Sequence, residues 1–153
     1  MNERTDINTV VNYILRNIRA TNKKLQKLVY YAYAWYIVEN NENDNITNVL
    51  FHEQPEAWVH GPVFPVLYDR YKDNGRNEIA IPDDVIEIDE ELALFLDEIL
   101  NVFGPFDGDQ LELMTHNELP WQKARGNAKT DEISTNPIDL QDIYNYYTSL
   151  TYA

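Results

Sequence analysis

Few residues in this sequence have the type and spacing that catalysis requires. The 153 residues include no cysteine, which removes thiol nucleophiles and cysteine-ligated zinc. Serine occurs only at Ser134, in a polar stretch, and at Ser149, near the end of the chain, and neither belongs to a G-x-S-x-G motif. The five glycines do not fall into the spacing of a phosphate-binding loop. The sequence therefore argues against an enzyme that uses a nucleophilic side chain or a bound nucleotide.

The imidazole and carboxylate groups also lack the spacing of a metal centre. The three histidines, His52, His60 and His116, form no H-x-x-x-H or H-x-x-E-H pattern with one another. Asp107 and Asp109 are close enough in sequence to act as a general acid and base or to bind a cation, but Asp107 beside a glycine is more typical of a helix N-cap. We therefore expect no metal and no cofactor. An enzyme remains an alternative, and an activity abolished by His116→Ala would indicate it.

The charge of the chain is strongly negative and unevenly distributed. The formal net charge is −14, although residues 1–27 carry six Lys or Arg and only two acids. Residues 77–122 contain thirteen Asp or Glu and no Lys or Arg. Such a field repels nucleic-acid phosphates and favours a basic partner, although acidity of this kind also simply keeps proteins in solution. We expect no direct nucleic-acid binding, because the few basic residues gather where they can neutralise the acidic body.

No segment has the composition of a membrane span or a secretion signal. The most apolar run without a charge, residues 28–38, is eleven residues long, whereas a spanning helix needs about 20. The first eight residues are polar and contain no apolar stretch. The absence of cysteine fits a reducing compartment. The sequence therefore predicts a soluble cytoplasmic protein that is not associated with a membrane.

Apolar periodicity predicts a mainly α-helical fold with about six helices in a single domain spanning residues 1–153. Capping residues mark four helix starts: Thr5 or Asp6, Thr21, Asp89 and Asp107. The second helix is apolar on more than one face, which places it in the middle of the domain. The first expected helix begins at residue 7. The other expected helices span residues 22 to about 39, 63–72, 90–103, 108 to about 116, and 138–149, and a short helical turn opens at residue 120.

The predicted β-structure is minor. Residues 49–60 are ambiguous, with short extended segments plausible at 50–51 and 57–59. Segments 79–81 and 85–88 are rich in β-branched residues and flank a Pro-Asp-Asp turn, so they predict a small hairpin.

Three segments, taken in order, resemble a known family. Residues 21–32 resemble the pattern T-x-x-K-L-Q-K-L-L-Y-Y-A, residues 56–71 resemble E-A-W-x-x-G-P-V-x-P-x-x-Y, and residues 115–124 resemble T-H-x-E-x-P-W-x-x-A. These blocks are similar to those of the Panacea domain of SocA-like antitoxins, and they cover almost the whole chain. The departures are small: Asp107 stands where many members have serine, which is another N-cap residue, and the acidic stretch is particular to this chain.

The resemblance implies a mostly helical antitoxin domain that suppresses a toxin encoded beside it by direct protein contact. Members of the family are common in bacterial chromosomes, prophages and phages. Many carry an extra DNA-binding or other domain, and we expect this chain to resemble the minimal form. Two alternatives stay open. The chain could be an acidic phage or mobile-element inhibitor that mimics nucleic acid in the groove of a host defence protein, or an adaptor that delivers its partner to a protease.

The family's motif residues have a structural interpretation and a partner-binding one, and the structural interpretation is favoured because a family with variable partners should keep its core. Lys27 is the exception, a charge in an apolar helix that Glu56 or Glu118 could pair with. The motif residues are Lys27, Tyr30, Trp58, Gly61, Pro62, Tyr68, Thr115, His116, Pro120 and Trp121.

The candidate surface for a basic toxin is the acidic stretch, where carboxylates would steer the encounter and exposed aromatics would supply binding energy. Tyr147 is a further aromatic candidate. The surface comprises Asp89, Glu90, Asp97, Phe103, Phe106, Asp107, Asp109 and Glu112.

Overall fold

The computed structural model describes residues 1–151, which form seven α-helices, one 3-10 helix and two small pairs of strands. The expected mainly α-helical fold is confirmed, with one helix more than anticipated. The helices are α1 (Ile7–Asn17), α2 (Asn22–Glu39), α3 (Pro65–Tyr71), η1 (Lys72–Asn74), α4 (Glu90–Phe103), α5 (Gly108–His116), α6 (Leu119–Arg125) and α7 (Leu140–Thr151).

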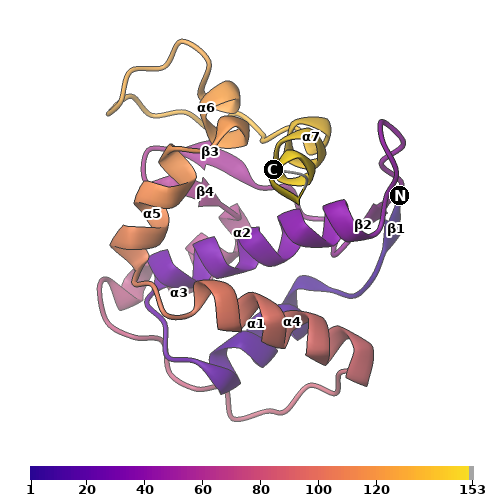
Figure 1. Ribbon diagram of the computed structural model, residues 1–153. Coiled ribbons are helices and arrows are strands. Elements are labelled where there is room, and N and C mark those ends of the chain that lie inside the picture. Colours follow the sequence, from indigo (N-terminus) through magenta and orange to yellow (C-terminus); the bar gives the residue numbers. More distant parts are fainter. Residues whose placement is uncertain (152–153) are drawn as a thin grey trace.

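Helix α2 is the centre of the fold, as its apolar residues on several faces predicted. In Figure 1 it crosses the middle of the molecule, with α5, α6 and α7 along one side and α1 and α4 along the other. The side chain of Thr21 caps it by accepting a hydrogen bond from the backbone N–H of Lys24. Because neighbours surround it, twelve of its eighteen residues are buried, including all of Leu28–Ala34.

The expected N-caps organise the other helices. Asp6 caps α1, Asp89 caps α4, and Asp107 forms a reciprocal capping box with Gln110 at the start of α5. The cap function of Asp107 is therefore confirmed. Helix α7 begins at Leu140, two residues later than expected, because Pro137 takes part in a β-bridge with Glu56 instead of opening the helix.

The extended segment expected at residues 57–59 overlaps a strand of the structure, at residues 56–58, but the other expected strands do not form. Residues 79–81 and 85–88 form no strand, so the hairpin expected there is wrong. Side chains of α1 satisfy the backbone of this segment instead: Asn12 bonds the carbonyl of Asp84 and the N–H of Ile86, and Arg16 donates to the carbonyl of Pro82. These backbone groups therefore have hydrogen-bond partners without a neighbouring β-strand.

The hairpin of this fold is formed by β3 (Glu56–Trp58) and β4 (Gly61–Val63), which pair antiparallel. Helix α3 therefore starts at Pro65 and not at residue 63, with the proline in its first turn, where a missing N–H costs nothing. Strands β1 (Asn2–Glu3) and β2 (Asn48–Val49) pair in parallel near the N-terminus. The extended segment expected at residues 50–51 is not part of a strand.

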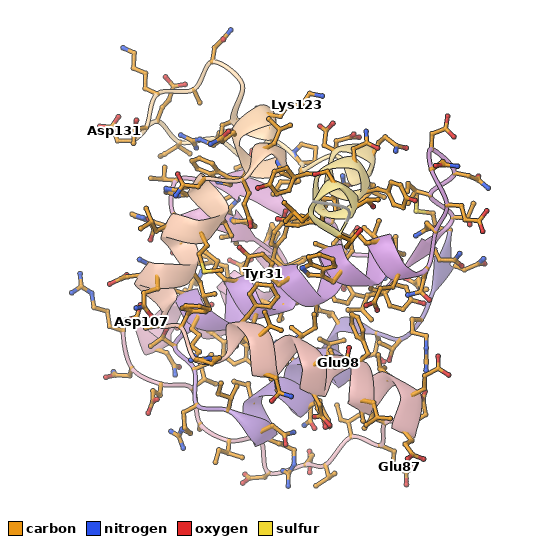
Figure 2. All side chains as sticks on the ribbon, viewed as in Figure 1. Tyr31, Glu87, Glu98, Asp107, Lys123 and Asp131 are labelled. Carbon is orange, nitrogen blue, oxygen red and sulfur yellow. The ribbon has the colours of Figure 1, made fainter. Side chains whose placement is uncertain are left out.

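One contiguous apolar cluster fills the space between these elements. It is unusually rich in tyrosine, with Tyr30, Tyr31, Tyr33 and Tyr147 almost fully buried. Tyr31, labelled in Figure 2 in the middle of α2, stacks on Phe103 of α4 with ring centroids 4.0 Å apart. Within residues 1–151, no helix is long and apolar enough to cross a membrane.

Candidate functional site

The three sequence blocks that resemble the antitoxin family meet in space. Trp58 of β3 accepts a hydrogen bond at its carbonyl from the indole Nε1 of Trp121 in α6, at 2.8 Å. The Trp121 ring stacks on His116 of α5 with centroids 4.1 Å apart, while the Trp58 ring meets Tyr68 of α3 edge-on at 4.9 Å. These contacts connect the hairpin to α3, α5 and α6, which supports the structural interpretation of the motif.

Gly61 lies against Lys27 at the point where the hairpin crosses α2. The φ angle of Gly61 is +109°, and a Cβ there would lie 2.7 Å from Cε of Lys27 and 3.0 Å from Oγ1 of Thr115. Only glycine combines that backbone conformation with so close an approach. Pro62 follows it and is buried in β4.

The amine of Lys27 is buried without a salt-bridge partner. The residue is 1% exposed, lines the cleft described below, and among residues 1–151 its Nζ forms no hydrogen bond or ion pair. Burial lowers the pKa of Lys27 to about 7, and the charge of Glu112 only partly opposes this effect. The expected pairing of Lys27 with Glu56 or Glu118 is wrong, because both carboxylates accept hydrogen bonds elsewhere.

Glu56 accepts from the indole Nε1 of its neighbour Trp58 at 2.9 Å. Glu118 joins the tyrosine cluster, where its Oε1 accepts from the hydroxyls of Tyr31 at 2.9 Å and Tyr147 at 2.8 Å. The hydroxyl of Tyr30 lies 3.0 Å from that of Tyr147. Burial raises the pKa of Glu118 to about 7, although both hydrogen bonds favour its charged form. Pro120 is buried just beyond it.

Glu112 is the carboxylate that faces the motif cluster. Its Oε1 lies 2.7 Å from Nζ of Lys23, and its Oε2 lies 3.0 Å from Nδ1 of His60 and 3.9 Å from Nε2 of His116. Burial alone would raise the pKa of Glu112. The hydrogen bonds from Lys23 and His60 outweigh this effect and hold that pKa below its usual value. Burial lowers the pKa of His116. No group of three or more metal-ligating side chains is assembled within residues 1–151.

Arg125 is a buried residue that no pattern in the sequence indicates. Its guanidinium donates to the carbonyls of Lys129 at 2.6 Å and Glu132 at 2.7 Å, and more weakly to that of Ala57. It also lies over the Trp121 ring, 5.3 Å from the centroid. The composition of residues 125–135 is that of a polar surface loop, and this one side chain ties the loop to the hairpin.

A cleft of about 630 Å³ opens beside Lys27, between α2, the hairpin, α3 and the loop that Arg125 holds. Its size is that of a typical ligand site. The sequence contained one signal for it, the charged Lys27 inside an apolar helix. The residues that line it include Lys23, Gln26, Lys27, Trp58, Val59, His60, Val63, Tyr68, Lys72, Arg76 and Ile133.

Several members of the expected acidic surface are already used inside the molecule. Asp89 binds Arg4 through both oxygens at 2.7 Å, and Asp97 accepts from the hydroxyl of Tyr13 at 2.5 Å. Asp109 shares Lys23 with Glu112. Asp107 caps α5, whereas Glu90 is exposed in the first turn of α4. Figure 2 labels Glu87, Glu98 and Asp107 around α4 and the start of α5.

The aromatic residues expected to be exposed on this surface are not. Phe103 is 8% exposed and Tyr147 is 1% exposed, and Phe106 is half-buried against the core. The expectation of exposure is therefore wrong for Phe103 and Tyr147, because Phe103 stacks on Tyr31 and Tyr147 meets Tyr31 edge-on. A hydrophobic residue on an acidic segment reveals its orientation only when the packing is known.

The comparison with protein families identifies the class. The family described as "Antitoxin SocA-like, Panacea domain" matches residues 25–122, more than half of the chain. The chain therefore belongs to the SocA-like antitoxin family, and the resemblance of its three blocks is confirmed. It is similar to Antitoxin SocA of Caulobacter vibrioides (strain NA1000 / CB15N), with 28% identity over 134 residues covering 76% of this chain and 68% of that protein. No solved structure matches the chain significantly.

Proposed function

We propose that this chain acts as one antitoxin domain that neutralises a co-encoded protein toxin by binding it directly, in the cytoplasm and without catalysis. The observation that carries the proposal is the family match over residues 25–122. Those residues include the whole interlocked cluster of Lys27, Gly61, His116 and Trp121, so the matched motif corresponds to a folded framework. A framework of this kind can present a surface that differs from member to member.

The outer side of α4 is the contact surface that suits a basic toxin. Leu94 and Val102 are 58% and 59% exposed, and Glu90 and Glu98 are exposed on the same helix. Residues spaced by four share one helical face, so Glu90, Leu94, Glu98 and Val102 form a single stripe. Carboxylates steer a basic partner, and the apolar side chains between them supply burial on contact. These aliphatic residues replace the aromatics that the sequence suggested.

The experiment is co-expression of this chain with the product of the adjacent gene. We expect the neighbour to be toxic alone, harmless together with this chain, and recovered with it in a stable complex. Glu98→Lys should weaken the complex, whereas Glu42→Lys, an exposed substitution of the same charge change away from α4, should not. A neighbour that is harmless alone and does not co-purify would contradict the proposal.

A second candidate function has support from the charge. The net charge of −14 and the unbroken acidity of residues 77–122 suit an inhibitor that occupies the nucleic-acid groove of a defence protein. A competition experiment separates the two functions. Nucleic acid would displace such an inhibitor from its target, whereas nucleic acid would not dissociate a toxin complex that forms away from a nucleic-acid groove. A fall in partner level that depends on a protease would instead indicate a delivery adaptor.

A further inference from the structure

The cleft beside Lys27 has the opposite charge to the rest of the molecule. It is lined by Lys23, Lys27, Lys72 and Arg76, and among its described lining residues none carries a carboxylate, although the chain as a whole has a net charge of −14. This local reversal of sign does not follow from composition. A binding surface recognises its partner by complementary potential.

The cations of the cleft differ in how far they are already neutralised. Lys23 is paired with Asp109 at 3.0 Å and with Glu112 at 2.7 Å. Lys72 has only Asp69 at 3.8 Å on its own helical segment, and Arg76 has no ion pair within residues 1–151. Lys27 is the one that is both buried and without a hydrogen-bonded partner there. The cationic side chains without an ion pair are therefore Lys27 at the base of the cleft and Arg76 at its rim.

We propose that this cleft binds a carboxylate-bearing segment of a partner protein, with Lys27 as the cation at its base. A buried amine without a partner is unfavourable, and leaving it so is costly in the free protein. A carboxylate that enters the cleft supplies the missing acceptor and forms a charge-assisted hydrogen bond. Glu112 does not fill this role, because its two oxygens are taken by Lys23 and His60.

The apolar walls of the cleft favour a protein segment over a small free anion. Trp58, Val59 and Val63 form one wall, and Tyr68 stands at the edge. At the mouth Ile133 is 85% exposed although its loop is held in place by Arg125. A small anion would leave these side chains in water, whereas a peptide with an apolar residue next to its carboxylate would cover them.

Anion binding at Lys27 is coupled to protonation. The lysine has a pKa of about 7 in the free protein, and a bound carboxylate favours its charged form. The other charged or titratable groups that line the cleft are Lys23, His60, Tyr68, Lys72 and Arg76. Glu112 on α5 lies 3.0 Å from His60, and His116 lies 3.9 Å from Glu112. Lys27 itself lines the cleft, is 1% exposed and forms no hydrogen bond or ion pair within residues 1–151. Nε2 of His116 is also buried without a hydrogen-bond partner there, but His116 is not among the lining residues. Binding should therefore weaken as pH rises above about 7.

This inference rests on the proposed function, because it takes the occupant of the cleft to be part of a partner protein. The cleft would be a second contact with that partner, besides the acidic stripe on α4. The first experiment does not need the toxin. The full chain is used to select from short displayed peptides with free C-termini, and the enriched peptides are measured by fluorescence anisotropy at about pH 6 and about pH 9.

We expect enriched peptides to carry Asp, Glu or a C-terminal carboxylate beside an apolar residue. Lys27→Met should weaken their binding about 10- to 100-fold, the loss of one charge-assisted hydrogen bond. Lys123→Met removes the same charge from an exposed position outside the cleft and should leave affinity within about twofold. If Lys27→Met does not fold, Arg76→Glu and Ile133→Ser test the exposed rim, and each should lower affinity.

Three results would overturn the proposal: no enrichment, enrichment of basic peptides, or equal affinity for Lys27→Met. Tight binding of inorganic phosphate together with no peptide binding would assign the cleft to small anions instead. A second arm uses the co-purified toxin complex. If Lys27→Met and Arg76→Glu retain the toxin as well as the natural chain does, the cleft is not a toxin contact although the antitoxin function stands. If the natural chain captures no toxin, the antitoxin function fails while the peptide selection still decides the cleft.

Discussion

The side chain of Lys27 and the backbone of Gly61 are in direct contact: a Cβ at position 61 would lie 2.7 Å from Cε and 3.3 Å from Nζ of the lysine. This contact joins the first and second family blocks, and it seals most of the amine from water. Its consequence is that the fold and the charge at the base of the cleft depend on the same pair of residues.

Gly61→Ala should lower the free energy of unfolding by about 2–4 kcal/mol, since it combines backbone strain at φ +109° with overpacking against Lys27. Denaturant unfolding measures this loss. Gly126→Ala is the matched control, because Gly126 also has a positive φ but has no atom within 4 Å of its Cβ position. It should cost about 1–3 kcal/mol from backbone strain alone, because L-residues rarely adopt φ +57° with ψ −122°. Equal losses at the two positions would argue that the contact with Lys27 is unimportant.

Lys27→Met should remove a pH dependence of stability. The pKa of Lys27 is lowered from 10.5 to about 7, so between these values the unfolded chain binds more protons and the natural protein becomes more stable as pH rises. We expect the methionine variant to be more stable near pH 6, by up to roughly 4 kcal/mol, with the difference shrinking towards pH 10. Unfolding midpoints across this range measure it. A methionine variant that is less stable near pH 6 would show that the amine is satisfied in the free protein.

Glu118→Gln should remove a pH dependence of stability that has the opposite sign and lies at lower pH. The pKa of Glu118 is raised from 4.5 to about 7, so the folded state binds more protons between these values and stability falls as pH rises. Glutamine retains an acceptor for Tyr31 and Tyr147 without the charge, so it should be neutral near pH 4.5 and stabilising near pH 8. Glu118→Leu, which leaves both hydroxyls without this acceptor, should cost about 1–3 kcal/mol. A glutamine variant with the natural pH profile would contradict this account.

Arg125→Met should release the loop 126–135 while the helices persist. Two short hydrogen bonds, to the carbonyls of Lys129 and Glu132, hold that loop against the hairpin. We expect faster amide exchange in residues 126–135 and a loss of about 1–3 kcal/mol in stability. Hydrogen exchange read by mass spectrometry localises the change. Lys123→Met, on the exposed side of the same helix, should leave exchange of the loop unchanged.

The helices and their caps could be predicted because their signals are local. Asp89 is followed by an amphipathic run, and α4 begins and ends where that pattern does. The sequence predicts a hairpin at residues 79–81 and 85–88 because the β-branched residues there have the composition of strands. Composition does not show that Asn12 and Arg16, some seventy residues away, satisfy that backbone instead. Non-local hydrogen bonds of this kind leave no pattern in a neighbouring stretch of sequence.

The sequence by itself determined the family, the helical class and the absence of cysteine, because motif blocks, periodicity and residue types are properties of the chain. It also identified Lys27 as unusual. Only the tertiary structure decided that Lys27 has no carboxylate partner, that Phe103 and Tyr147 are buried, and that a basic cleft exists in an acidic protein. The physical reason is that burial and electrostatic potential are sums over residues brought together from α2, the hairpin, α3 and the loop beyond α6, and no local stretch of sequence contains such a sum.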